Sequence, residues 1–225
     1  QPTRTPDGSY ATGYTTSKWA AENLLRDAHD RYGLPTTVFR SGLILAHRHY
    51  TGQLNVPDML TRIICSVLLT GLAPATFGAG TPNPIGGVPV DHLAASINAL
   101  GTTGTGGYRT FHAVGTDPAG ATLDTVVDWL VDDGAAITRI DDHADWLHRF
   151  EIGLRAAPPR IAAVTALPLL GALSTPQNPA PPPSNTEYAR ALTRAGLVDT
   201  TGIPGLTRTL VAKYRSDLTA LGLIG

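Results

Sequence analysis

Residues 13–22 read Gly-Tyr-Thr-Thr-Ser-Lys-Trp-Ala-Ala-Glu and give the strongest helix signal in the chain. It opens a run of apolar and small residues at helical spacing, which predicts a helix over residues 13–32. Gly33 is a typical residue just past a helix end, and a proline two positions later prevents continuation. The β-branched run 35–40 and the apolar run 42–45 then predict buried strands. A helix followed closely by a buried strand is half of a β-α-β crossover, so we expect a parallel sheet.

The rest of the chain continues to alternate between helix and strand signals. Helices are expected at 57–69, at 88–100 with Asp91 as the N-cap, at 123–131 and at 141–155, and a strand at 108–114. Prolines predict a semi-rigid linker over 156–185, and residues 186–225 are expected to form two helices around 202–205. We therefore divide the chain into residues 1–155, the linker 156–185 and the helical segment 186–225.

Tyr14 and Lys18 form the combination with the clearest chemistry. They are four residues apart, so a helix places both on one face with their Cβ atoms roughly 5–6 Å apart. A phenol titrates at about 10, and a neighbouring ammonium group lowers that pKa by favouring the phenolate. Tyr14 can then act as a general acid toward a carbonyl oxygen, while Lys18 can also hold ribose hydroxyls. The alternative interpretation is an ordinary solvated pair on a helix surface.

Composition strengthens the first interpretation. Only two of the 17 basic residues are lysines, Lys18 and Lys213, and the others are arginines. Arginine would replace Lys18 poorly, because its guanidinium is bulkier and forked rather than a compact charge. A chain that favours arginine so strongly has therefore kept a lysine at the position where the chemistry requires one.

Three segments in order carry a family resemblance. Residues 14–22, with Tyr14, Ser17 and Lys18, resemble the active-site helix of extended short-chain dehydrogenase/reductases. Residues 38–42 resemble the strand that follows that helix, and residues 88–94 resemble a later turn into a helix. The resemblance implies a Rossmann-like, doubly wound parallel sheet of the α/β class. It also implies a smaller, mostly helical substrate-binding part.

A closer resemblance covers nearly the whole chain. The segments 13–22, 52–59, 128–130, 145–150 and 213–218 are similar to the terminal thioester-reductase domain of carboxylic acid reductases. In that family an adenylation domain activates a carboxylic acid, a phosphopantetheine arm carries the acyl thioester, and the terminal domain reduces it with NADPH to an aldehyde. The resemblance implies NADP(H) as cofactor and acyl-phosphopantetheine as tethered substrate. Adenylation and carrier domains of the same polypeptide are the implied partners.

The same resemblance assigns roles to individual residues. It implies that Tyr14 and Lys18 are catalytic and contact the cofactor, and that Ser41 and Gly42 line the nicotinamide. It places residues 52–59 near the entrance for the phosphopantetheine arm; the alternative is a loop and helix start without ligand contact.

The cofactor-binding half is expected upstream of Tyr14. The family needs a Gly-rich turn between its first strand and helix to hold the pyrophosphate, and only 13 residues precede Tyr14. The Gly-rich run 101–107 follows a helix and leads into a strand, which is the wrong order for phosphate binding. Because the chain also begins with Gln1 and a polar loop, we expect a processed chain or a fragment. We expect the chain alone to be inactive, with the missing half supplied upstream or by another chain.

Two alternative functions remain open on the residues. One keeps the fold and changes the substrate, as in a sugar-nucleotide epimerase or a hydroxysteroid-type dehydrogenase. The other is a non-catalytic remnant that only docks a carrier domain. The similarity beyond residue 128 speaks against the first, and the retained Lys18 speaks against the second.

Bulk properties narrow the remaining classes. The net charge of −1 predicts neither a nucleic-acid surface nor a polybasic membrane patch. The single cysteine, Cys65, excludes an intrachain disulfide, and the run 47–49 lacks the further ligands of a metal site, so no metal is expected. The longest apolar run, 161–173, is shorter than the about 20 residues that cross a bilayer. We expect a cytoplasmic protein without membrane or nucleic-acid partners.

Overall fold

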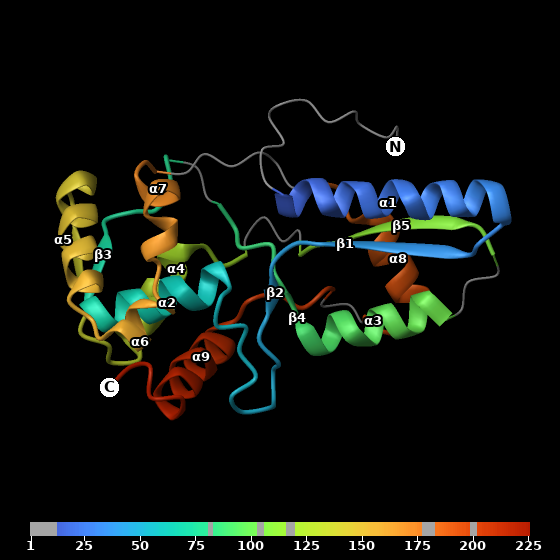
Figure 1. The fold of residues 1–225 in the computed structure, drawn as a ribbon. Coiled ribbons are helices and arrows are strands. Elements are labelled where there is room, and N and C mark those ends of the chain that lie inside the picture. Colours follow the sequence, from blue (N-terminus) through green and yellow to red (C-terminus); the bar gives the residue numbers. More distant parts are fainter. Residues whose placement is uncertain (1–12, 81–82, 103–105, 116–119, 177–182, 199–201) are drawn as a thin grey trace.

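The computed structural model describes residues 13–80, 83–102, 106–115, 120–176, 183–198 and 202–225. The first half of the chain contains α1 (Gly13–Tyr32), β1 (Thr36–Ser41), β2 (Ile44–Leu45), α2 (Met59–Thr70), β3 (Leu72–Pro74), β4 (Val88–Pro89), α3 (Val90–Thr102) and β5 (Tyr108–Ala113). The second half contains α4 (Leu123–Asp132), β6 (Thr138–Ile140), α5 (His143–Arg155), α6 (Pro159–Ala162), the 3-10 helix η1 (Leu167–Leu169), α7 (Leu170–Leu173), α8 (Thr186–Arg194) and α9 (Arg208–Ala220). Figure 1 shows these elements along the chain.

The described strands form three pairs, and every pair is parallel. β1 pairs with β5 over six positions, from Thr36 opposite Tyr108 to Ser41 opposite Ala113. Two shorter pairs join β2 with β4 and β3 with β6. The prediction of a parallel α/β arrangement is confirmed.

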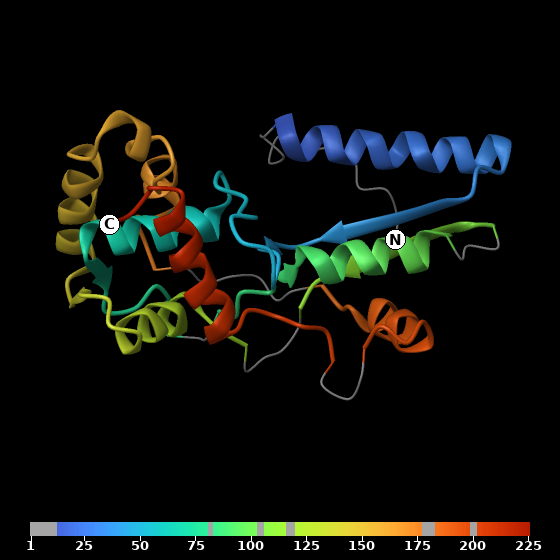
Figure 2. The same ribbon diagram turned by 90° about the horizontal axis from the view of Figure 1, so that it is seen from below.

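The β1–β5 pair is covered by helices on both faces. α1 lies along one face, and α3 with α8 lies along the other (Figures 1 and 2). Because side chains alternate across a strand, Arg40 reaches α1 while Phe39 points away from it. Phe39 packs against Phe111 at 5.5 Å between ring centroids, and Phe111 packs against the buried Tyr188 of α8 at 6.2 Å. This part of the chain is therefore doubly wound.

The other part of the chain is mostly helical and surrounds the short β3–β6 pair. Its core holds the fully buried Trp146 and Phe150 of α5 and Tyr214 of α9. α2 crosses between them as a largely buried helix. Asp58 caps its first turn by accepting from the Leu60 N–H, and its end is closed by a left-handed glycine at position 71.

Part of the segment predicted as a linker, residues 156–185, is helical. Residues 156–176 form α6, η1 and α7, and Ala166 and Leu173 are buried in the core beside Trp146. Prolines stand in the first positions of α6 and η1, where they start short helices rather than prevent them. Residues 177–182 of the predicted linker lie outside the described part of the chain.

The last predicted segment, 186–225, forms two helices that pack on different parts of the protein. α8 inserts Tyr188 and Leu192 against β5 and α3, in the doubly wound part. α9 instead packs on α2 and α4, in the helical part. The chain thus passes from the doubly wound part at α8 to the helical part at α9.

The remaining features of the fold concern the single cysteine and the apolar character of the helices. Cys65 is buried in α2, and burial raises the pKa of its thiol to about 11. Within the described residues, no helix combines the length and apolar character needed to cross a membrane.

Candidate active site

α1 presents Tyr14 and Lys18 together on an open surface. The Tyr14 side chain is 72 % exposed, and the Lys18 Nζ lies 5.5 Å from the centroid of its ring. Ser17 lies between them and donates from its Oγ to the Tyr14 carbonyl oxygen at 2.8 Å. The predicted pair is therefore on one face of the helix, with both functional groups accessible to a ligand.

α1 is held on the sheet by polar and aromatic contacts rather than by buried apolar side chains. None of its residues is buried. Arg40 at the end of β1 donates two hydrogen bonds to the Glu22 carboxylate. The Arg26 guanidinium lies 3.5 Å from the ring centroid of Tyr108 on β5, and His29 contacts the same ring at 5.8 Å. These contacts fix the position of the helix that carries Tyr14 and Lys18.

Ser41 ends β1 and Gly42 follows it, while Tyr14 is in the first turn of α1. Figure 1 shows the end of β1 on the same side as the start of α1. Ligands of open α/β sheets bind outside the carboxyl ends of the strands, which is this end. Gly42 donates to the Ala113 carbonyl oxygen at 3.3 Å. A Cβ at Gly42 would lie 3.2 Å from the Gly86 carbonyl oxygen, so the two backbone segments approach closely because Gly42 has no side chain.

The donor set at this end fits the nicotinamide-ribose portion of a dinucleotide. The Tyr14 hydroxyl can donate to a carbonyl oxygen, and the Lys18 ammonium has three hydrogens for ribose hydroxyls. Both groups are exposed and adjacent, as such contacts require. Gly101, from the run dismissed as a phosphate site, lies inside α3, and residues 103–105 lie outside the described part.

The loop after β2 contains a charge pair that sequence reasoning missed. Arg48 donates to Asp91 from its backbone N–H at 3.3 Å and from its Nε at 2.6 Å. Burial opposes ionisation of Asp91, but the hydrogen bonds and charge of Arg48 offset it and hold the pKa of that carboxyl below its usual value. Asp91 was predicted as an N-cap, whereas α3 begins one residue earlier at Val90. Its carboxylate ties the helix start to the loop.

His47 in the same loop has a local structural role. Its ring stacks on Tyr50 at 4.0 Å, and its Nδ1 accepts from the backbone N–H groups of His49 and Tyr50. Among the described residues, no group of three metal-ligating side chains comes together. The His47 imidazole therefore stabilises the conformation of its own loop.

Comparison with known proteins assigns this arrangement to a family. A NAD-binding family described as male sterility protein matches residues 1–97. The carboxylic acid reductase of Segniliparus rugosus is 44 % identical over 98 % of this chain, and the isonitrile lipopeptide synthase of Mycobacterium tuberculosis is 40 % identical over 99 %. The crystal structure of the reductase (R) domain of a nonribosomal peptide synthetase from Mycobacterium tuberculosis superposes with a TM-score of 0.88 at 39 % identity, over 98 % of this chain. The chain is similar to these reductase proteins over nearly its whole length.

The resemblance to the reductase domain of carboxylic acid reductases is thus confirmed. The chain covers only part of each relative: 19 % of the Segniliparus rugosus enzyme, 10 % of the synthase and 54 % of the solved reductase domain. The family match and the reductase names of the relatives together support a nicotinamide cofactor.

Proposed function

We propose that this chain is the C-terminal portion of a reductase domain that converts a phosphopantetheine-bound acyl thioester to an aldehyde with NADPH. The observation that carries the proposal is the exposed Tyr14–Lys18 pair at the ligand-binding end of a doubly wound parallel unit. The 39 % identity to the solved reductase domain over 98 % of this chain supports it.

In this proposal each residue of the chain has a defined task. NADPH, when bound, supplies the hydride. The Tyr14 hydroxyl donates to the thioester carbonyl oxygen as negative charge develops there. The tetrahedral adduct then breaks its C–S bond, which releases the aldehyde and the phosphopantetheine thiol. Lys18 holds the ribose hydroxyls through its three ammonium hydrogens. Ser41 and Gly42 provide the surface along which the nicotinamide lies.

The surface formed by β1 and α1 is suited to contact with a further half of the reductase domain. Among the described residues, β1 pairs with β5 only, so β1 is an edge strand of this two-stranded sheet. α1 exposes Leu24 to 70 % and Tyr32 to 80 % beside it. We propose that the cofactor-binding half, containing the Gly-rich turn, adds a strand to this edge and covers α1.

Residues 52–59 are proposed to border the entrance of the phosphopantetheine arm. Both ends of the loop that contains them are anchored, since the Ala46 N–H donates to the Tyr214 hydroxyl and Asp58 caps α2. Between these anchors Tyr50 is 66 % exposed. An anchored loop with an exposed middle can meet a carrier domain without disturbing the core.

The deciding experiment compares this chain with a polypeptide extended upstream to the length of the solved reductase domains. NADPH binding is followed by fluorescence titration, and aldehyde release is measured from an acyl-phosphopantetheine thioester. We expect binding and reduction only for the extended polypeptide, and loss of reduction without loss of binding in its Tyr14→Phe variant. Tight NADPH binding by the short chain would overturn the proposed division. Full activity of Tyr14→Phe would overturn the role of Tyr14, and Tyr32→Phe on the same helix is the matched control.

A further inference from the structure

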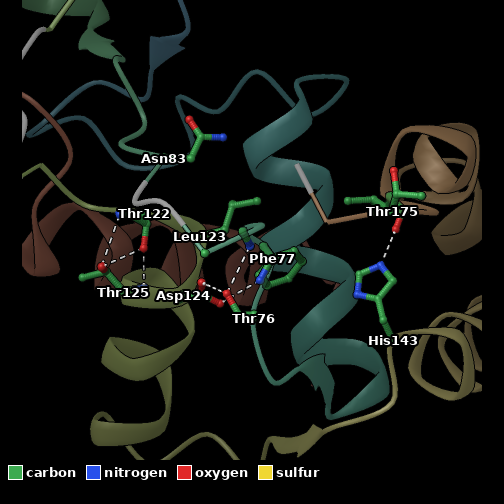
Figure 3. A pocket seen from close by; sticks show the side chains of 12 residues that line it. Thr76, Phe77, Asn83, Thr122, Leu123, Asp124, Thr125, His143 and Thr175 are labelled. Carbon is green, nitrogen blue, oxygen red and sulfur yellow. Dashed lines mark hydrogen bonds between the residues drawn. The ribbon is translucent and has the colours of Figure 1, made fainter. Parts of the chain in front are cut away.

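A cavity of about 460 Å³ lies in the helical part, and Figure 3 shows side chains that line it. Its volume lies within the range of about 300–1,000 Å³ typical of small-molecule sites. It opens where β3 and β6 end, between the loop after β3, the start of α4, the start of α5 and the end of α7. Because β3 and β6 are parallel, their carboxyl ends meet at one edge, which is where open α/β sheets bind ligands.

The wall formed by the loop after β3 is preformed. Asp124 at the start of α4 accepts from the Thr76 hydroxyl at 2.7 Å and from the Phe77 N–H at 3.1 Å. Arg139 of β6 donates to the same carboxylate at 3.3 Å and to Asp128 at 2.6 Å. The loop is therefore attached to α4, and the carboxylate of Asp124 is occupied by protein donors.

The opposite wall is fixed by α5. His143 donates from its Nε2 to the Leu173 carbonyl oxygen of α7 at 2.8 Å, as Figure 3 shows. The buried Trp146 supports both walls, since its ring contacts Phe77 at 5.7 Å and His143 at 5.0 Å between centroids. A cavity with both walls held in this way does not need to form around its ligand.

The lining selects for an uncharged ligand. Phe77, Leu123 and Leu173 contribute apolar surface, and threonine hydroxyls with the Asn83 amide contribute neutral hydrogen-bonding groups. Of the described residues that line the cavity, none is a lysine or an arginine, and the one carboxylate, Asp124, is already paired with Arg139. A phosphate or carboxylate would lose its hydration here without gaining a cation of its own, whereas an alkyl chain with a neutral carbonyl finds suitable surface.

A short stretch of chain connects this cavity with the end of β1. Asn83 lines the cavity, and three residues later the Gly86 carbonyl oxygen approaches Gly42. Three residues of extended chain span at most about 11 Å. Ile85 between them is fixed by its N–H bond to the Ala121 carbonyl oxygen at 2.7 Å. A substrate whose reacting carbon lies near Gly42 could therefore extend its acyl chain over this distance into the cavity.

From this geometry we propose that the cavity binds the uncharged acyl chain of the thioester substrate and so determines chain-length preference. The proposal rests on the proposed thioester reduction and adds the subsite for the acyl group. It assigns Thr175 to the rim and Phe77, Leu123 and Leu173 to the apolar wall.

The test measures binding of two probes of equal chain length by titration calorimetry on the upstream-extended polypeptide without NADPH. The neutral probe is S-octanoyl-N-acetylcysteamine, and the anionic probe is octanoate. We expect the neutral probe to bind at least tenfold more tightly. Thr175→Phe, which fills the rim, should weaken the neutral probe at least tenfold, whereas Ser174→Phe on the adjacent exposed residue should not. Equal affinity for both probes, or equal effects of the two variants, would overturn the proposal.

A second pair of variants adds a positive charge, which tests the position of the rim without relying on a bulky side chain to block it. Thr175→Lys places a cation at the rim and should raise the affinity for octanoate at least tenfold, while Ser174→Lys should leave it unchanged. No gain in Thr175→Lys would contradict the assigned rim. If the probes behave as expected but the polypeptide reduces no thioester, the proposed function fails and the acyl site stands. If thioesters are reduced with the same KM for octanoyl substrate in Thr175→Phe and Ser174→Phe, the acyl site fails and the function stands.

Discussion

Arg40 and Glu22 join the strand β1 to the helix α1 through a two-pronged contact. The Arg40 Nε donates to Glu22 Oε2 at 3.0 Å, and its Nη2 donates to Oε1 at 2.5 Å. The hydrogen bond that Arg40 donates to Glu22 is the main cause that raises the pKa of Arg40. Glu22 lies two helical turns after Tyr14, on a helix without buried residues. The pair therefore contributes to the position of the whole helix.

Glu22→Gln should lower the free energy of unfolding by about 1 kcal/mol, because it removes one charge from a partly exposed, two-pronged pair. Urea denaturation followed by circular dichroism measures this change. Asp27→Asn is the matched control, since Asp27 pairs with Arg31 on the same helix by one more exposed contact. It should cost no more than about 0.5 kcal/mol. Equal losses in the two variants would contradict a positioning role for Glu22.

Lys18→Arg should reduce activity of the extended polypeptide at least tenfold although the positive charge is retained. The forked guanidinium cannot replace a compact ammonium beside the Tyr14 ring and the ribose hydroxyls. Steady-state kinetics should show a raised KM for NADPH together with a lowered kcat. The reverse exchange at an exposed position of the same helix, Arg31→Lys, should leave both constants unchanged. Wild-type kinetics in Lys18→Arg would show that charge alone suffices.

Lys213→Met should lower the free energy of unfolding by about 3–5 kcal/mol. Lys213 pairs with Asp217 one turn later on α9, and the Asp217 side chain is only 1 % exposed. Removing the lysine leaves that carboxylate buried without its partner. Chemical denaturation measures the loss, and the double variant Lys213→Met/Asp217→Asn should recover most of it. A double variant as unstable as the single one would contradict this explanation.

Tyr214→Phe should change both stability and its dependence on alkaline pH. The variant leaves the buried Ala46 N–H without its acceptor, which costs about 1–3 kcal/mol at neutral pH. Burial, together with the nearby Asp58 and Asp217 charges, raises the pKa of Tyr214 to about 12. A raised pKa in the folded state favours the protonated form, so the tyrosine's contribution is complete below pH 10 and is lost as pH rises toward 12.

The alkaline part of this prediction is measured by urea denaturation at pH 9 and pH 11.5. The wild-type chain should lose more stability over that interval than Tyr214→Phe, because only the wild type ionises Tyr214 in its unfolded state. The raised pKa of Cys65 acts in the same direction in both chains and cancels in the comparison. Equal losses would show that Tyr214 does not titrate differently on unfolding.

Local sequence patterns predicted the elements around the candidate site well. α1 occupies the predicted range of residues 13–32 because helical periodicity, a following glycine and a proline all agree there. β5 and α4 lie within one residue of expectation for similar reasons. The Tyr14–Lys18 pair was predictable because helical spacing alone places residues four apart on one face.

Two features could not be predicted locally. The proline content of 156–185 indicated a linker, yet apolar residues such as Ala166 and Leu173 are buried by contacts with α5 that lie far away in sequence. Likewise, the rarity of lysine drew attention to Lys18, but the other lysine, Lys213, forms a buried ion pair without a place in the proposed site. Rarity alone therefore does not separate a chemical role from a structural one.

The helix with Tyr14 and Lys18, the strand that follows it and the parallel class of the fold could all be predicted from local sequence. These depend on spacing and on residues that are neighbours along the chain. The hydrogen bond between Ala46 and Tyr214, 168 positions apart, and the cavity lined by Thr76, Asp124 and His143 were visible only in the folded chain. The reason is physical: helical and strand periodicity act over a few residues, whereas a cavity is formed by side chains whose elements meet only when the core packs.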